Sequence, residues 1–130
     1  MKRTLAVSAA LAGLATALTV PGTADAAPRI TPHTAPAGSD ITYTLWSDSR
    51  RNVYHYYGFK GALITTNHHA RFSDTGGGAY TLSVTFKAQR TQPAGIRIRS
   101  GSGKYAKCEV RIDGRRVDSA RNVSGGFAVC

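Results

Sequence analysis

The stretch CEVRIDGRRVDSARNVSGGFAVC, residues 108–130, contains both cysteines of the 130-residue chain. Two cysteines in a small exported domain usually pair, and a bond from Cys108 to Cys130 would close a 23-residue loop. In the chain-entropy description, closing such a loop contributes about 3 kcal/mol of stability. The alternatives are a reactive thiol or a metal site with His68 and His69. No Cys-x-x-Cys spacing is present and these histidines lie about 40 residues away, so a structural disulfide is expected.

The first half of this stretch predicts a β-hairpin. Asp113-Gly114 is a favoured pair of residues for a two-residue type I′ turn. Such a turn fixes which residues face each other across the two strands. The predicted pairs are Ile112–Arg115, Arg111–Arg116, Val110–Val117 and Glu109–Asp118.

The predicted register balances charge across the hairpin. The direct outward pairs are like-charged, which is unfavourable. The diagonal neighbours compensate, because they bring Arg111 near Asp118 and Glu109 near Arg116. Cys108 falls on the inward face, so its partner cysteine must approach from another strand.

Upstream of the hairpin, apolar residues recur at every second position in residues 41–45, 80–86 and 96–98. This alternation is typical of β-strands, and the Gly- and Pro-rich stretches between these segments are typical of turns. Short strands at this spacing predict an all-β fold, a small antiparallel β-sandwich, for residues 40–130. Residues 27–39 contain three prolines and show no periodicity, which predicts a flexible leader.

The N-terminus has the features of a secretory signal peptide. Lys2 and Arg3 precede an apolar run, residues 5–20, that is shorter than the roughly 20 residues of a membrane-spanning helix. Residues 24–26 read Ala-Asp-Ala, the small-x-small pattern of a cleavage site. We expect residues 1–26 to be removed and the protein to be secreted or to lie on the outer face of the cell membrane. The alternative is that this segment stays as an uncleaved anchor.

The chain is strongly basic, with a formal net charge of +10. Removal of residues 1–26 takes away two basic residues and one acidic residue, which leaves +9. A secreted domain with this charge is attracted to anionic surfaces, although the same charge also keeps a protein soluble. Arg97, Arg99, Arg111 and Arg116 are predicted to point outward, and they would form one basic face if their strands are neighbours.

A second candidate binding region is RRNVYHYYGFK, residues 50–60. Aromatic residues interleaved with basic ones can stack on rings and hold phosphate groups. Arg50, Arg51, Tyr54 and Tyr56 are therefore candidate ligand contacts. In a strand, however, Tyr54 and Tyr56 share one face and His55 points to the other, so an assignment of these residues to core and surface explains most of the pattern.

No set of residues suggests catalysis. The chain has one glutamate, Glu109, on the predicted outward face of the hairpin, and its histidines are dispersed. No nucleophile motif, phosphate-binding loop or metal-ligand spacing is present. We therefore expect a non-enzymatic protein with no metal and no cofactor.

The segment that begins with Cys108, continues through Asp113-Gly114 and ends in Phe127-Ala128-Val129-Cys130 resembles the C-terminus of the MmpS proteins. These are small accessory subunits of MmpL transporters, which export lipids and siderophores across the envelope. The resemblance implies an immunoglobulin-like β-sandwich whose two C-terminal cysteines are bridged. It also implies a role in transport with a large envelope transporter as the partner.

Other classes of function stay open at this stage. A basic β-sandwich can instead bind a small molecule, a polyanion such as an anionic envelope component, or a protease. A small secreted ribonuclease is a further alternative, but all four histidines precede Glu109, the reverse of the order usual in those enzymes. No specific nucleic-acid partner is expected.

Overall fold

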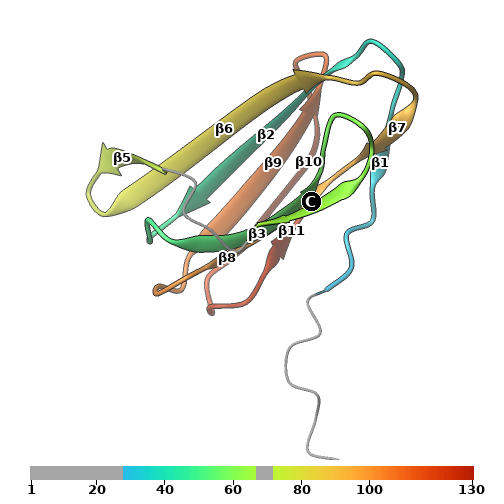
Figure 1. Ribbon diagram of the computed structural model, residues 1–130. Helices are drawn as coiled ribbons and strands as arrows, with labels where there is room; N and C mark the ends of the chain where they lie inside the picture. Colours follow the sequence, from blue (N-terminus) through green and yellow to red (C-terminus); the bar gives the residue numbers. More distant parts are fainter. Residues whose placement is uncertain (1–27, 67–71) are drawn as a thin grey trace, which may run out of the picture.

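The computed structural model describes residues 28–66 and 72–130. The described residues form strands and no helix (Figure 1). The strands are β1 (His33–Ala35), β2 (Asp40–Ser47), β3 (Asn52–Tyr57), β4 (Leu63–Thr66), β5 (Ser73–Gly76), β6 (Ala79–Lys87), β7 (Gln92–Ala94), β8 (Ile96–Ser100), β9 (Ala106–Ile112), β10 (Arg115–Asn122) and β11 (Ala128–Val129). The predicted signal peptide, together with His68 and His69, lies outside the described residues.

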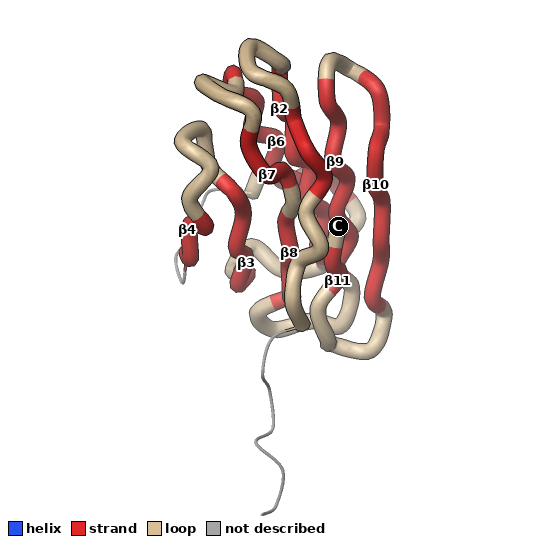
Figure 2. Tube along the Cα trace, turned by 90° about the vertical axis from the view of Figure 1, so that its right-hand side faces the viewer, coloured by secondary structure: helices blue, strands red, loops and turns tan. Residues whose placement is uncertain are grey.

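Two antiparallel sheets form the sandwich. One has the strand order β10-β9-β2-β6-β5 and the other β11-β8-β3-β4 (Figure 2). Strands β1 and β7 pair as a separate ribbon (Figure 1). In an immunoglobulin domain, one sheet contains strands A, B, E and D, and the other contains C, F and G. The neighbours β5-β6-β2 correspond to D-E-B, and β4-β3-β8-β11 correspond to C′-C-F-G. The hairpin β9–β10 is inserted between F and G and takes the place of strand A beside β2.

The core follows from the alternation along the strands. Ile41, Tyr43 and Leu45 of β2 are at most 2% exposed and face Ile96 and Ile98 of β8, which are at most 1% exposed. The residues between them, such as Thr42 and Thr44, lie on the outer face of the five-stranded sheet. The sequence prediction of an all-β sandwich is therefore confirmed.

The predicted disulfide is also present. Cys108 of β9 and Cys130, directly after β11, are bonded and buried at 0% and 2% exposure. Cys130 continues the four-stranded sheet, because its N–H donates to the carbonyl of Ile96 and its carbonyl accepts from the N–H of Ile96. The bridge therefore joins one sheet to the other. Ala128 is buried with Cys130, and the intervening Val129 points outward.

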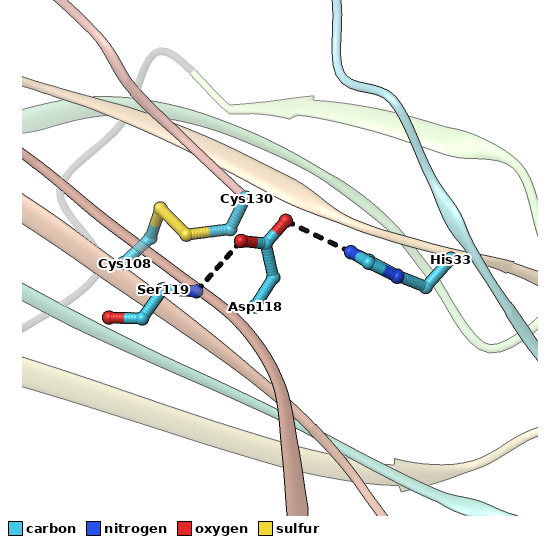
Figure 3. The surroundings of a disulfide bond; sticks show 5 residues. All are labelled: His33, Cys108, Asp118, Ser119 and Cys130. Carbon is cyan, nitrogen blue, oxygen red and sulfur yellow. Dashed lines mark hydrogen bonds and ion pairs between the residues drawn. A yellow bond between two sulfur atoms is a disulfide. The ribbon is translucent and has the colours of Figure 1, made fainter.

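The predicted flexible leader is wrong for residues 33–35. This segment is β1, which pairs with β7 in the register His33–Ala94 to Ala35–Gln92, and Ala35 is fully buried. His33 Nε2 also lies 2.9 Å from Asp118 Oδ2 of β10 (Figure 3). The N-terminal segment is thus held by sheet pairing and by a side-chain contact to a strand that is far away in the sequence.

The predicted hairpin is present, with a different register in its second half. Asp113 and Gly114 both have positive φ, 52° and 77°, as a type I′ turn requires. The first two predicted pairs form, but a bulge at Val117 then places Asp118 opposite Val110. The predicted Val110–Val117 and Glu109–Asp118 pairs are therefore wrong. A bulge adds one unpaired residue to a strand, and each later pair shifts by one position.

The predicted diagonal ion pairs are also absent from this hairpin. Glu109 lies on the outer face, as predicted, but it is only 8% exposed, and it accepts a hydrogen bond from Arg111 Nε two residues along the same strand. Asp118 contacts His33 instead of Arg111. The shift at the bulge moves Asp118 to the inner side of β10, where the N-terminal segment reaches it.

Candidate binding surfaces

The four arginines predicted to share one basic face lie on two different faces. Arg97 and Arg99 belong to β8 in the four-stranded sheet, whereas Arg111 and Arg116 belong to β9 and β10 in the five-stranded sheet. All four point away from the core, as expected. The prediction of a single face is wrong because the chain crosses from one sheet to the other between β8 and β9, which puts the two pairs on opposite outer surfaces.

The candidate ligand contacts in residues 50–60 are divided between the core and the surface of the domain. Tyr54 is 6% exposed and packs edge-on against Phe72, and Tyr56 packs edge-on against Tyr43. The two tyrosines are inner residues of β3, because they pair with the buried Ile98 and Ile96. They are part of the core and do not form a ligand-contact surface.

Arg50 and Arg51 are exposed and lie in the turn between β2 and β3. The Arg50 guanidinium lies 5.6 Å from the centre of the Tyr80 ring and 4.0 Å from Asp74. The Arg51 carbonyl accepts hydrogen bonds from the N–H of Gly101 and from Ser49 Oγ. Their contacts are with the end of the sandwich and not with the outward residues of β3.

The outward residues of β3 and β8 form a cluster that the sequence prediction missed in part. His55, Arg97, Arg99 and Phe127 meet on the outer face of the four-stranded sheet, and we call them the arginine–histidine cluster. The carbon at the centre of the guanidinium lies 5.5 Å from the centre of the Phe127 ring for Arg97 and 5.1 Å for Arg99. The imidazole of His55 is stacked on the same ring at 6.2 Å and 26°.

The alternation of side chains along a strand could have identified the two missed members of the cluster, His55 and Phe127. His55 alternates with Tyr54 and Tyr56 along β3, and it pairs directly with Arg97 across to β8. Phe127 alternates with the buried Ala128 at the end of the chain. Once Cys130 is placed inward by the disulfide, Phe127 has to point outward.

The hydrogen bonding of His55 defines its protonation. Arg97 Nε donates to His55 Nδ1 at 2.7 Å, so Nδ1 carries no proton and Nε2 holds the proton of the neutral ring. Burial lowers the pKa of His55, and the positive charges of Arg97 and Arg99 lower it further. His55 is therefore a neutral donor at neutral pH.

The segment of residues 28–30 borders the arginine–histidine cluster on one side. Arg97 Nη1 donates to the carbonyl of Pro28 at 2.7 Å. A shallow pocket beside this contact is lined by Arg29, Ile30, Tyr57, Leu63 and Arg97. The pocket adds a further arginine and apolar surface to the edge of the cluster.

The four-stranded sheet has no acidic residue in its strands, which read NVYHYY, LITT, IRIRS and AV. The five-stranded sheet differs, because Glu109 accepts from Arg111 Nε and offsets the charge of that arginine. Arg111 Nη1 also donates to the carbonyl of Gly114. Of the four arginines, Arg97 and Arg99 therefore have no carboxylate in the strands of their own sheet, whereas Arg111 is paired with Glu109.

The described residues contain no group of three or more His, Cys, Asp or Glu side chains placed to hold a metal ion. In the same part of the chain, no helix has the length and apolar character needed to cross a membrane. The sequence matches no known protein family, no curated protein and no solved structure.

Proposed function

We propose that this protein is a non-enzymatic module, secreted or held at the outer face of the cell membrane, that binds an anionic component of the envelope. The observation that carries the proposal is the arginine–histidine cluster on a sheet whose strands contain no carboxylate. A guanidinium presents several N–H donors in a plane, which suits sulfate, phosphate and carboxylate groups.

Within the cluster, each residue has a distinct role in this proposal. Arg99 is the main anion contact, with its guanidinium held over the ring of Phe127 at 5.1 Å. Arg97 positions its neighbours through its bonds to His55 and Pro28. His55 contributes an N–H donor without adding a second charge that would have to be neutralised.

The test is binding of a fluorescently labelled sulfated dextran at two salt concentrations. Arg99→Gln is expected to weaken binding about three- to tenfold, since a charged hydrogen bond to an exposed anion is lost. The matched control is Arg115→Gln, which removes the same charge from the exposed hairpin on the other sheet. Equal losses in both variants would show that net charge alone attracts the polymer and would contradict the proposal.

Salt is a second criterion in the same assay. Exposed charges are screened over about 10 Å at 0.1 M and about 3 Å at 1 M ionic strength. Wild-type binding should therefore fall as salt rises, and the difference between wild type and Arg99→Gln should narrow. Binding that persists unchanged at high salt would point to an apolar contact instead.

The proposed location has its own test. Protein recovered from the culture fluid is expected to begin at or near Ala27, which intact-mass measurement determines. Full-length protein found only in the membrane fraction would show that residues 1–26 are retained as an anchor.

The second candidate function is that of a transport accessory protein of the MmpS type. The resemblance in residues 108–130 supports it, and so does the immunoglobulin-like strand order with its C-terminal bridge. In this role the sheet faces would contact a large envelope transporter. Co-purification of the secreted domain with such a transporter from envelope extract tests this candidate, and its absence under gentle detergent conditions would contradict it.

A further inference from the structure

The outer face of the five-stranded sheet carries a second group of residues, distinct from the arginine–histidine cluster. Trp46 of β2, Lys107 of β9 and Arg121 of β10 are cross-strand neighbours in one row, because Trp46 pairs with Lys107 and Lys107 pairs with Arg121. On the other side of Trp46, the same row continues to Thr81 of β6. Adjacent strands are about 4.8 Å apart, so the row crosses roughly 14 Å of sheet.

Trp46 is half-buried and faces outward between the buried Leu45 and Ser47. The ammonium group of Lys107 lies 4.6 Å from the centre of its ring. This contact places a flat apolar ring and a positive charge within reach of one small ligand group. Arg121 is exposed and adds a second charge at the edge of the sheet.

Hydroxyl groups line β2 and β6 further along this face, next to Glu109 and Arg111 of β9. Thr42 Oγ1 lies 2.9 Å from Thr85 Oγ1, and Thr44 Oγ1 lies 3.3 Å from Ser83 Oγ. A hydroxyl has one donor and two acceptor positions, so each of these pairs keeps hydrogen-bonding capacity for a ligand. Rings that carry both hydroxyl and anionic groups match this combination of aromatic, hydroxyl and cationic side chains.

We propose that the row Trp46–Lys107–Arg121 is a binding site for an anionic polysaccharide, with one sugar ring packed beside Lys107 against the exposed part of Trp46 and its acidic substituent held by Lys107 and Arg121. Single-stranded nucleic acid fits less well, because binders of that class offer aromatic rings to successive bases. The strands of this sheet place one aromatic side chain, Trp46, on their outer face. The site deepens the proposed function by naming a ligand class and a second surface for it.

The sequence provides a direct reporter, since Trp46 is the single tryptophan of the chain. Its fluorescence is titrated with dextran sulfate, polygalacturonate, neutral dextran and a thymidine oligonucleotide. We expect a saturating change in emission with the two acidic polysaccharides and a weaker response to the oligonucleotide. An equal response to neutral dextran, or a response to the oligonucleotide alone, would overturn the proposal.

Variants assign the response to the row. Lys107→Gln and Arg121→Gln are each expected to weaken the acidic-polysaccharide titration about three- to tenfold. Lys60→Gln is the matched control, because it removes the same charge from the loop after β3. Thermal unfolding of each variant checks that the fold is intact, and an equal loss with Lys60→Gln would overturn the assignment.

The titration is repeated with Arg99→Gln, in which the main contact of the arginine–histidine cluster is absent. A Trp46 response in this background supports the row whatever the outcome at the cluster. Loss of the response in this background would mean that the polymer binds only at the cluster and would overturn the second site.

Discussion

The phenol of Tyr43, which lies between the two sheets, donates a hydrogen bond at 2.8 Å to the backbone carbonyl of Tyr57. The same oxygen accepts a hydrogen bond from the N–H of Gly95 at 3.1 Å. One side chain of the five-stranded sheet thus hydrogen-bonds to a backbone carbonyl at the end of β3 and to a backbone N–H directly before β8. Burial raises the pKa of Tyr43 well above its ordinary value, so the phenol stays protonated in alkaline solution.

Removing this hydroxyl should destabilise the domain. Tyr43→Phe removes the hydroxyl partner of a partly buried carbonyl and of a buried N–H, which costs about 1–3 kcal/mol. Urea unfolding of the variant measures the loss. Tyr56→Phe is the control, because Tyr56 packs on the same ring and its hydroxyl makes no hydrogen bond within the described part of the chain. Equal losses in the two variants would show that ring packing, and not the hydrogen bonds, is responsible.

The disulfide should contribute a measurable share of stability. Thiol titration of the unfolded, unreduced protein is expected to find no free thiol. Replacing Cys108 and Cys130 with serine should lower the free energy of unfolding by about 2–4 kcal/mol. Because both cysteines are buried, a Cys→Ala pair separates loss of the bond from burial of the serine hydroxyls. Two titratable thiols in the wild-type protein would contradict the prediction.

Acidification should weaken the fold through His55. Its pKa in the folded protein is lower than in the unfolded chain, first because of burial and then because of Arg97 and Arg99. The stability linked to this group is therefore present above an unfolded pKa of about 6.5 and is lost as the pH falls through the folded value. Unfolding midpoints measured between pH 8 and about pH 4.5 should drop more steeply for wild type than for His55→Gln. Parallel curves would contradict this prediction.

Substitution by glutamine should have different effects at the two arginines of β8, Arg97 and Arg99. Arg97→Gln removes bonds to His55 and Pro28, so it should lower the unfolding temperature and raise amide exchange in residues 28–32. Arg99→Gln should leave both measurements near wild type and act on polymer affinity. Identical stability effects would show that the two residues have the same structural role.

Reversing the charge at both Arg97 and Arg99 should have a larger effect on anion binding than removing one charge. Arg97→Glu together with Arg99→Glu should abolish retention of the protein by anionic envelope material in a pull-down at low salt. Because Arg97 also holds the N-terminal segment, part of any loss of stability in this variant belongs to that contact. Arg99→Gln alone is therefore the cleaner measure of anion binding.

Local patterns were sufficient for the strands with regular alternation, β2, β6, β8 and β9, and for the direction of their side chains. Ile41, Tyr43 and Leu45 alternate with threonines, and they are buried because one face of β2 covers the core. The turn at Asp113-Gly114 was predictable for the same kind of reason, since its backbone geometry depends on those two residues. The disulfide was predicted from the presence of a single pair of cysteines in a small domain with a predicted export signal.

Relationships between distant strands were not predictable in this way. Alternation shows that Arg97 and Arg111 point outward, but it does not show that β8 and β9 belong to different sheets. The bulge at Val117 has no marker in the sequence, and it changes the partner of Asp118. The pairing of His33–Ala35 with β7 depends on where the rest of the chain leaves an open edge, which no local pattern reveals.

The bridge at Cys130 also makes the order of the arginine–histidine cluster depend on the oxidation state of the protein. Phe127 lies three residues before Cys130, and β11, which holds it beneath Arg97 and Arg99, is two residues long. In a reducing compartment this short strand loses its covalent attachment to β9, and the ring that organises both guanidinium groups is free to leave them. Under the proposed function, a reduced chain would therefore bind anions more weakly than the oxidised chain.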